Sequence, residues 1–245
     1  MTGVSGKQNT EDPYGNWEMV LGALETLLSI GDPFPDQDGF FDSIWRIWKE
    51  RIENGHNEEE KQIQSMYKEW KEQIGYSNDP SFDPDEWASD DYWQACRVTN
   101  SMYAALVVSM WSEMESFLRS IVSICSEALE KQKKNNEPHQ FKEILRKLKN
   151  FGIQVDQCAN YLTVDAIRIL NNSYKHSNGC YRPKEGRPYT RIDQTLISKW
   201  KIVKDQNEGE IDYSRLPIQE MVVDCNRFCS DLFGRVKAVL ESKAG

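Results

Sequence analysis

An uninterrupted run of helical periodicity from Asp91 to Lys133 constrains the fold more than any other feature of the sequence. Apolar residues recur every three or four positions over several turns, and no proline or glycine falls inside the run. These residues are Cys96, Met102, Tyr103, Leu106, Val107, Met110, Met114, Phe117, Leu118, Ile121, Ile124, Cys125 and Leu129. A helix of this length must cover its apolar side with other elements. The run therefore predicts a helical bundle built around one long helix.

Shorter stretches of the same periodicity lie on both sides of this run. We predict helices over residues 16–30, 39–54, 57–74, 139–151, 163–176 and 217–242. Residues 195–203 alternate enough to predict a short strand, which 211–213 would pair with across Gly209. The predicted fold class is all-α: a helical bundle with an additional acidic N-terminal helical segment and at most one short β-hairpin.

The clearest boundary falls after the first helices, in a stretch rich in proline, aspartate and asparagine. Two prolines and seven Asp, Asn or Glu residues lie within residues 77–91, a composition typical of loops. We therefore divide the chain into a flexible tail (1–13), an acidic helical segment (14–76), a linker (77–90) and a helical domain (91–245).

The net charge of −9 conceals a strong asymmetry along the chain. Residues 1–130 hold 9 Lys and Arg against 25 Asp and Glu, whereas residues 131–204 hold 16 against 6. A basic segment of this kind is what binding to phosphate groups requires. Solvated basic loops give the same pattern, so both interpretations remain open at this point.

The basic segment contains an unusual polar helix. Within Arg168-Ile-Leu-Asn-Asn-Ser-Tyr-Lys-His-Ser-Asn-Gly179, Arg168, Asn172 and His176 step by four and form one stripe. Asn171 and Lys175 fall on the same side, and Leu170 and Tyr174 fall on the other. Amide, guanidinium, ammonium and imidazole groups are suited to hydrogen-bonding phosphate, ribose or a base edge. An ordinary solvated helix face is the alternative.

This stretch resembles the motif helix of HEPN domains, the higher-eukaryote and prokaryote nucleotide-binding helical fold. The family's pattern is an Arg, a polar residue directly after it, three variable residues and a His. Asn172 matches the polar position and His176 the His, while Asn171 stands where the family has its Arg. The resemblance covers roughly residues 91–243.

The resemblance implies a metal-independent ribonuclease or RNA-binding effector of phage defence or a toxin–antitoxin pair. His176 would then be the acid or base, Asn172 would orient it, and Lys175 and Arg168 would hold the phosphate. It also implies a homodimer in which two motif helices meet, with an antitoxin or defence protein as a further partner.

Two neighbouring features would complete such a site. The loop after the motif helix supplies four basic candidates for RNA contact besides Asn171: Arg182, Lys184, Arg187 and Arg191. Glu115, inside the apolar run of the long helix, would pair with an Arg or Lys of the motif face. We expect no cofactor and no metal, because the three histidines are scattered and no carboxylates cluster.

The remaining expectations concern location and the competing function. There is no long apolar run and no apolar signal core, and the six cysteines form no Cys-x-x-Cys pair. We therefore expect a cytoplasmic protein with reduced, mostly buried thiols and no membrane contact. The competing hypothesis is a non-catalytic HEPN-like module that binds a protein or nucleotide within a larger complex, which Asn171 at the Arg position favours.

Overall fold

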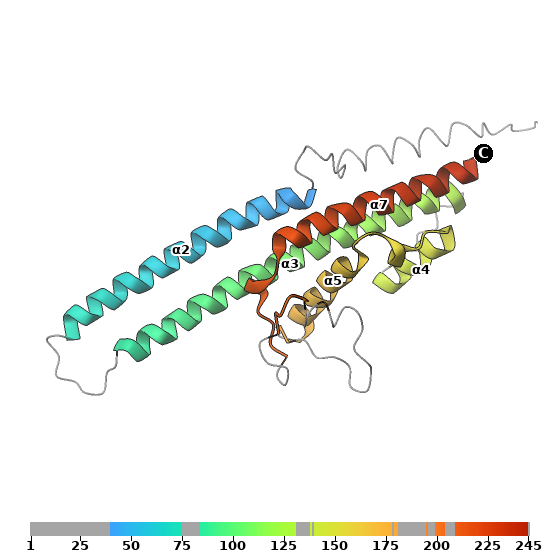
Figure 1. The fold of residues 1–245 in the computed structure, drawn as a ribbon. Coiled ribbons are helices and arrows are strands. Elements are labelled where there is room, and N and C mark those ends of the chain that lie inside the picture. The colour runs from blue at the N-terminus through green and yellow to red at the C-terminus, as the bar shows by residue number, and fades with distance from the viewer. Residues whose placement is uncertain are drawn as a thin grey trace, which may run out of the picture.

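The computed structural model describes residues 40–74, 84–130, 138, 140–177, 179–180, 195, 199–203 and 209–244. Its α-helices are α2 (Phe40–Ile74), α3 (Pro84–Glu130), α4 (Phe141–Phe151), α5 (Tyr161–His176) and α7 (Ile218–Ala244), shown in Figure 1. Two short 3₁₀ turns, η1 (Val155–Gln157) and η3 (Tyr213–Arg215), precede α5 and α7. The predicted all-α fold class is confirmed. The predicted tail and the helix over 16–30 lie outside the described residues.

Helix α3 is the centre of the bundle, as its periodicity predicts. It contacts α2, α4, α5, α7 and η3. The helix begins at Pro84, so the expectation of a linker through residue 90 was wrong for its second half. Proline is favoured at the first helical position because its fixed φ suits the helix and its missing N–H is not needed there.

Helix α2 is one helix where the sequence suggested two. The expected break between 54 and 57 coincides with Gly55, yet the helix passes through this residue. A Cβ added at Gly55 would lie 3.5 Å from the Met102 methyl carbon, so α2 and α3 pack closely at this level. Gly55 therefore lies inside a continuous helix and does not end it.

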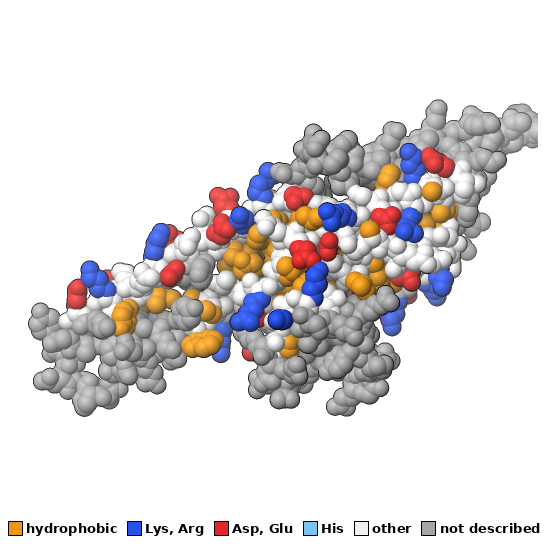
Figure 2. Space-filling model, viewed as in Figure 1, with side chains coloured by type: hydrophobic (Ala, Val, Ile, Leu, Met, Phe, Trp, Pro, Cys, Tyr) orange, Lys and Arg blue, Asp and Glu red, His pale blue; other side chains and the backbone are white. Residues whose placement is uncertain are grey.

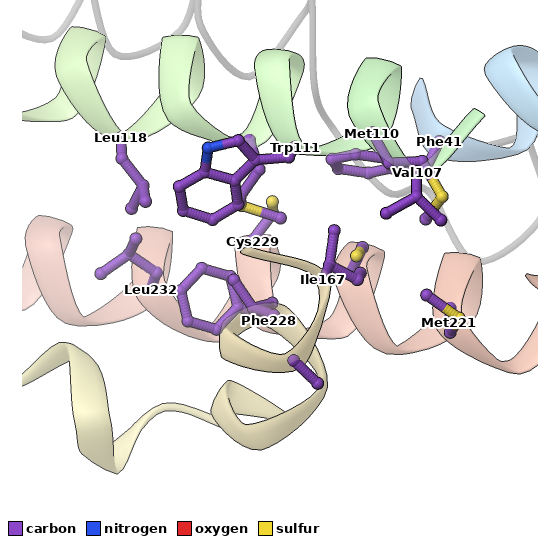
Figure 3. Close-up of a cluster of buried hydrophobic side chains, with 14 of the residues drawn as sticks. Phe41, Val107, Met110, Trp111, Leu118, Ile167, Met221, Phe228, Cys229 and Leu232 are labelled. Carbon is purple, nitrogen blue, oxygen red and sulfur yellow. The ribbon is translucent and has the colours of Figure 1, made fainter. Parts of the chain in front are cut away.

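The core is a single cluster to which the five described α-helices all contribute. Trp111 and Leu118 of α3 point toward Phe228 and Leu232 of α7, and Ile167 of α5 closes the cluster from one side (Figure 3). Phe41 and Ile52 of α2 belong to the same buried cluster. Helix α2 therefore packs into the same core as the helices after residue 91.

The described residues between α5 and α7 pair at two isolated points. Cys180 bridges Glu210 and Val203 bridges Ile211, both antiparallel, but the described residues contain no strand. The predicted strand over 195–203 was wrong at its start, because the Trp200 N–H donates to the Thr195 carbonyl, five residues earlier. That spacing belongs to a helical turn. The expectation of at most one hairpin is consistent with these isolated bridges.

The described helices include none whose length and apolar content would let it cross a membrane.

Candidate functional site

The candidate site lies on α5, which is anchored at both ends. Its start is at Tyr161, two residues before the predicted start, and the Thr163 hydroxyl donates to the Asp224 carboxylate of α7 at 2.7 Å. At the other end, the N–H groups of Ser177 and Gly179 both donate to the Ser173 carbonyl, at 3.0 and 3.1 Å. Gly179 has φ +77°, the left-handed conformation that commonly ends helices, so the predicted stop is confirmed.

Helix α5 is buried over a wider arc than its sequence suggested. Asn171, expected on the exposed polar side, has only 3% of its surface exposed. Its Nδ2 donates to the Asn172 Oδ1 at 3.3 Å, while its Oδ1 has no hydrogen-bond partner among the described residues. The expectation was wrong because α5 packs against both α3 and α7, so two flanks of the helix are covered.

Arg168 is engaged within the fold. Its Nε lies 2.5 Å from Oδ1 of Asp165, a buried carboxylate one turn earlier. Its guanidinium carbon also lies 5.2 Å from the ring centre of Phe141, which connects α5 to α4. Burial of the phenol, and then the Asp165 carboxylate, raise the pKa of Tyr161 to about 12, although Arg168 opposes this. The arginine predicted to hold a phosphate therefore neutralises a buried acid.

Three of the predicted residues do lie together on the surface. Asn172, Lys175 and His176 are exposed at the C-terminal end of α5. No carboxylate of the described residues forms an ion pair with Lys175 or His176. A helix C-terminus favours positive charge, so this end of α5 can present a cation together with an amide and an imidazole. We refer to these three residues as the α5 polar end.

Tyr174, expected to face inward, is 38% exposed beside the α5 polar end. Its ring makes an edge-on contact with Tyr213, with 5.9 Å between the ring centres. The buried Tyr213 hydroxyl donates to the Leu170 carbonyl at 2.9 Å. Tyr213 thus fixes the last turns of α5 from outside the helix.

Asn100 of α3 holds Tyr213 in place, and sequence reasoning missed both residues. The Asn100 Oδ1 accepts the N–H groups of Tyr213 at 2.6 Å and Ser214 at 3.3 Å, and its Nδ2 donates to the Ile211 carbonyl at 3.3 Å. The signal available in the sequence was an asparagine inside a long apolar helix, where the interior usually excludes unpaired amides.

Glu115 does not reach the motif helix. Its Oε1 lies 2.6 Å from Nη2 of Arg119, one turn later on α3, and Arg119 also donates to the Pro138 carbonyl. The predicted pairing with the motif face was therefore wrong. Residues four apart on a helix are neighbours, so Arg119 is within reach of this carboxylate.

Four other candidates, Arg182, Lys184, Arg187 and Arg191, lie outside the described residues. Within the described part of the chain, no group of three or more His, Cys, Asp or Glu side chains could hold a metal ion. All six cysteines are free thiols, and four of them are buried.

No family model, no curated protein and no solved structure matches this chain.

Proposed function

We propose that the protein is an HEPN-like effector that binds RNA through the α5 polar end. The observation that supports this proposal is the joint exposure of Asn172, Lys175 and His176 at a helix C-terminus, within a segment that carries net charge +10 over residues 131–204. The amide and imidazole offer hydrogen bonds, and Lys175 offers charge to a phosphate. The setting proposed with it, from the resemblance, is bacterial phage defence or a toxin–antitoxin pair, in the cytoplasm, with a protein partner.

The proposed activity is binding, without cleavage by a single chain. Metal-free cleavage of RNA needs an acid, a base and a cation on the developing charge. Asn171 is buried, and Arg168 is paired with Asp165, so among the described residues of α5 one chain offers the imidazole and one lysine. This geometry favours the non-catalytic form of the family's function.

Cleavage by a homodimer is the second candidate. Asn172 and His176 are one turn apart and both exposed, so two motif helices facing each other across a two-fold axis would bring two imidazoles together. Such a site would need no metal, and its activity would persist in EDTA.

A titration of labelled single-stranded RNA, followed by fluorescence anisotropy in EDTA, tests binding. We expect affinity to fall steeply with salt, because counterions are released from each contacted phosphate. Lys175→Glu should weaken binding several-fold. Lys61→Glu is the matched control, since this exposed lysine of α2 lies far along the chain and undergoes the same change of charge. Equal affinities for the two variants, or affinity that does not depend on salt, would refute the proposal.

Incubation of total RNA with the protein in EDTA separates the two candidates. Intact RNA is the expected result. Cleavage that is lost in His176→Ala, with an unchanged melting temperature, would replace the binding proposal with the homodimeric ribonuclease.

A further inference from the structure

Tyr174 is an exposed aromatic side chain at the end of a buried stripe of α5. Leu170, one turn earlier on the same side of the helix, is fully buried, whereas Tyr174 is 38% exposed. The next two residues, Lys175 and His176, belong to the α5 polar end. The ring therefore offers aromatic surface directly beside the groups that are suited to bind a phosphate.

The Tyr174 ring is held from the side of the core. Its edge-on partner Tyr213 is fixed by hydrogen bonds to the Leu170 carbonyl and to Asn100 of α3. An edge-on contact covers at most one face of a ring, so at least one face of Tyr174 is free of Tyr213. A side chain that is already held loses little conformational freedom when a ligand packs on it.

The exposed residues at the end of α5 follow one another around the helix. At about 100° per residue, Lys175 lies between Tyr174 on one side and Asn172 with His176 on the other, in an arc of about 200°. All four side chains are exposed, whereas Ser173, on the side opposite Lys175, is buried. A strand that crosses this turn meets first an aromatic ring, then an ammonium group, and then an amide and an imidazole.

This order of groups matches a nucleotide whose base is unpaired. Lys175 and Asn172 offer N–H donors to phosphate oxygens, and the ring offers a face to a base. The bases of a duplex are already stacked on each other, whereas those of a single strand can turn out onto an aromatic side chain. Acidic and basic side chains are mixed over the face of the molecule shown in Figure 2, so charge alone marks no path for a phosphate backbone on that face.

We propose that the α5 polar end binds single-stranded RNA, with one unpaired base stacked on the free face of Tyr174. This inference rests on the proposed function and adds to it the form of RNA that is recognised. Lys175 contacts the phosphate next to the stacked base, and Asn172 and His176 contact the nucleotide that follows. Every base has a face that can stack, so the site has little preference for sequence.

Substitution of the ring tests stacking by fluorescence anisotropy with labelled single-stranded RNA. Tyr174→Leu keeps an apolar side chain against Tyr213 but removes the aromatic face, and we expect it to weaken binding about tenfold. Tyr174→Phe should bind as the wild type does, because stacking does not need the hydroxyl. The dependence of affinity on salt should stay unchanged in Tyr174→Leu, which loses no phosphate contact, and become shallower in Lys175→Glu. Trp93→Leu is the matched control, since Trp93 is an aromatic residue of α3 that is 61% exposed.

A strand without bases tests the same contact in the wild-type protein. An abasic strand of equal length keeps the phosphates, so we expect the wild type to bind it about tenfold less tightly than the intact strand. Tyr174→Leu should bind the two strands with similar affinity, because the ring that distinguishes them is gone. A loss of affinity in Tyr174→Leu that is equally large with the abasic strand would show that the variant disturbs the helix and would overturn the stacking.

A duplex of the same sequence completes the experiment. It should bind the wild type more weakly than the single strand does, and Tyr174→Leu should not change its affinity. A duplex bound as tightly as the single strand overturns the inference. Single-strand binding that Lys175→Glu weakens and Tyr174→Leu does not also overturns it, but leaves the proposed function in place. Wild-type protein that binds neither form of RNA overturns both.

Discussion

Asn171 occupies the position at which the resemblance expects an arginine, yet the structure buries it. Its neighbour Asn172 is exposed, although the two differ by a single step of the helix. An amide can be accommodated in the flank of α5 because it is small and uncharged. A guanidinium there would lose its hydration without a partner among the described residues.

Restoring the family pattern should therefore destabilise the protein. We predict that Asn171→Arg lowers the free energy of unfolding by about 3 kcal/mol or more, the cost of burying an unpaired charge. Asn172→Arg, at the adjacent exposed position, should change it by less than about 0.5 kcal/mol. Urea unfolding of both variants measures the difference, and equal stabilities would contradict the burial of Asn171.

Residue spacing could predict part of this site. It placed Asn172, Lys175 and His176 on the surface, and the structure agrees. It placed Asn171 there too, because periodicity gives the direction of a side chain and not the width of the buried arc. Arg168 lies three residues after Asp165, a helical spacing that allows an ion pair, and the structure has this pair where the sequence analysis expected a phosphate contact.

At the scale of elements, two glycines occupy different structural positions: one lies inside a helix and the other follows the end of a helix. Gly55 lies inside α2, where a Cβ would meet Met102 at an ordinary contact distance. Gly179 lies after α5 with φ +77°. Sequence alone marks both as interruptions, because both residues have the same intrinsic flexibility. Only the packing partner and the backbone angle distinguish them.

Alanine at these glycines should act in opposite directions. Gly55→Ala should raise the free energy of unfolding by about 0.5–1 kcal/mol, because alanine restricts the unfolded chain and favours the helix. Gly179→Ala should lower it by about 1 kcal/mol, because an L side chain is strained in the left-handed region. Thermal melting of the two variants compares them. Destabilisation by Gly55→Ala would show that Met102 cannot adjust.

Helices themselves were the most predictable elements. The last residues of α4 and α7 fall within two positions of the predicted ends, because strong amphipathic periodicity and helix-ending residues agree there. Helix α3 begins seven residues earlier than expected, since Pro84 and its acidic neighbours begin the helix although they are typical of loops. The hydrogen bond from the Tyr213 N–H to the Asn100 Oδ1 joins residues that are 113 positions apart in the chain. No local sequence pattern specifies such a pair.

At the scale of the whole molecule, several weak acids are buried. Burial raises the pKa of the Cys158 thiol to about 11 from its ordinary 9.0, although Arg235 opposes this. Burial likewise raises the pKa values of Cys225 and Cys229 on α7, and that of Tyr161 to about 12. These groups therefore ionise at a higher pH in the folded protein than in the unfolded chain.

The protein should therefore lose stability in alkaline solution. An acid whose pKa is raised by folding makes its full contribution to the free energy of unfolding at pH values below its pKa in the unfolded chain. This contribution is lost as the pH rises toward the pKa of the acid in the folded protein. We predict that the free energy of unfolding falls progressively between pH 9 and 11, with a further fall toward 12. Urea titrations across this range measure it. Cys158→Ala should make the fall in the free energy of unfolding between pH 9 and 11 shallower. A free energy of unfolding that does not change with pH in the wild type would contradict the burial of these thiols.

Asn100 also has a consequence for how the chain is made. Its three hydrogen-bond partners lie 111 to 114 residues later in the chain, and α7 supplies one wall of the core. During synthesis, α3 leaves the ribosome after α2 but while α4, α5 and α7, which cover the rest of its apolar side, are still untranslated. Part of the apolar side of α3 therefore stays open to solvent, or to chaperones, until α7 has emerged. A nascent chain that stops before Pro217 would contain the α5 polar end intact but present an unfinished core.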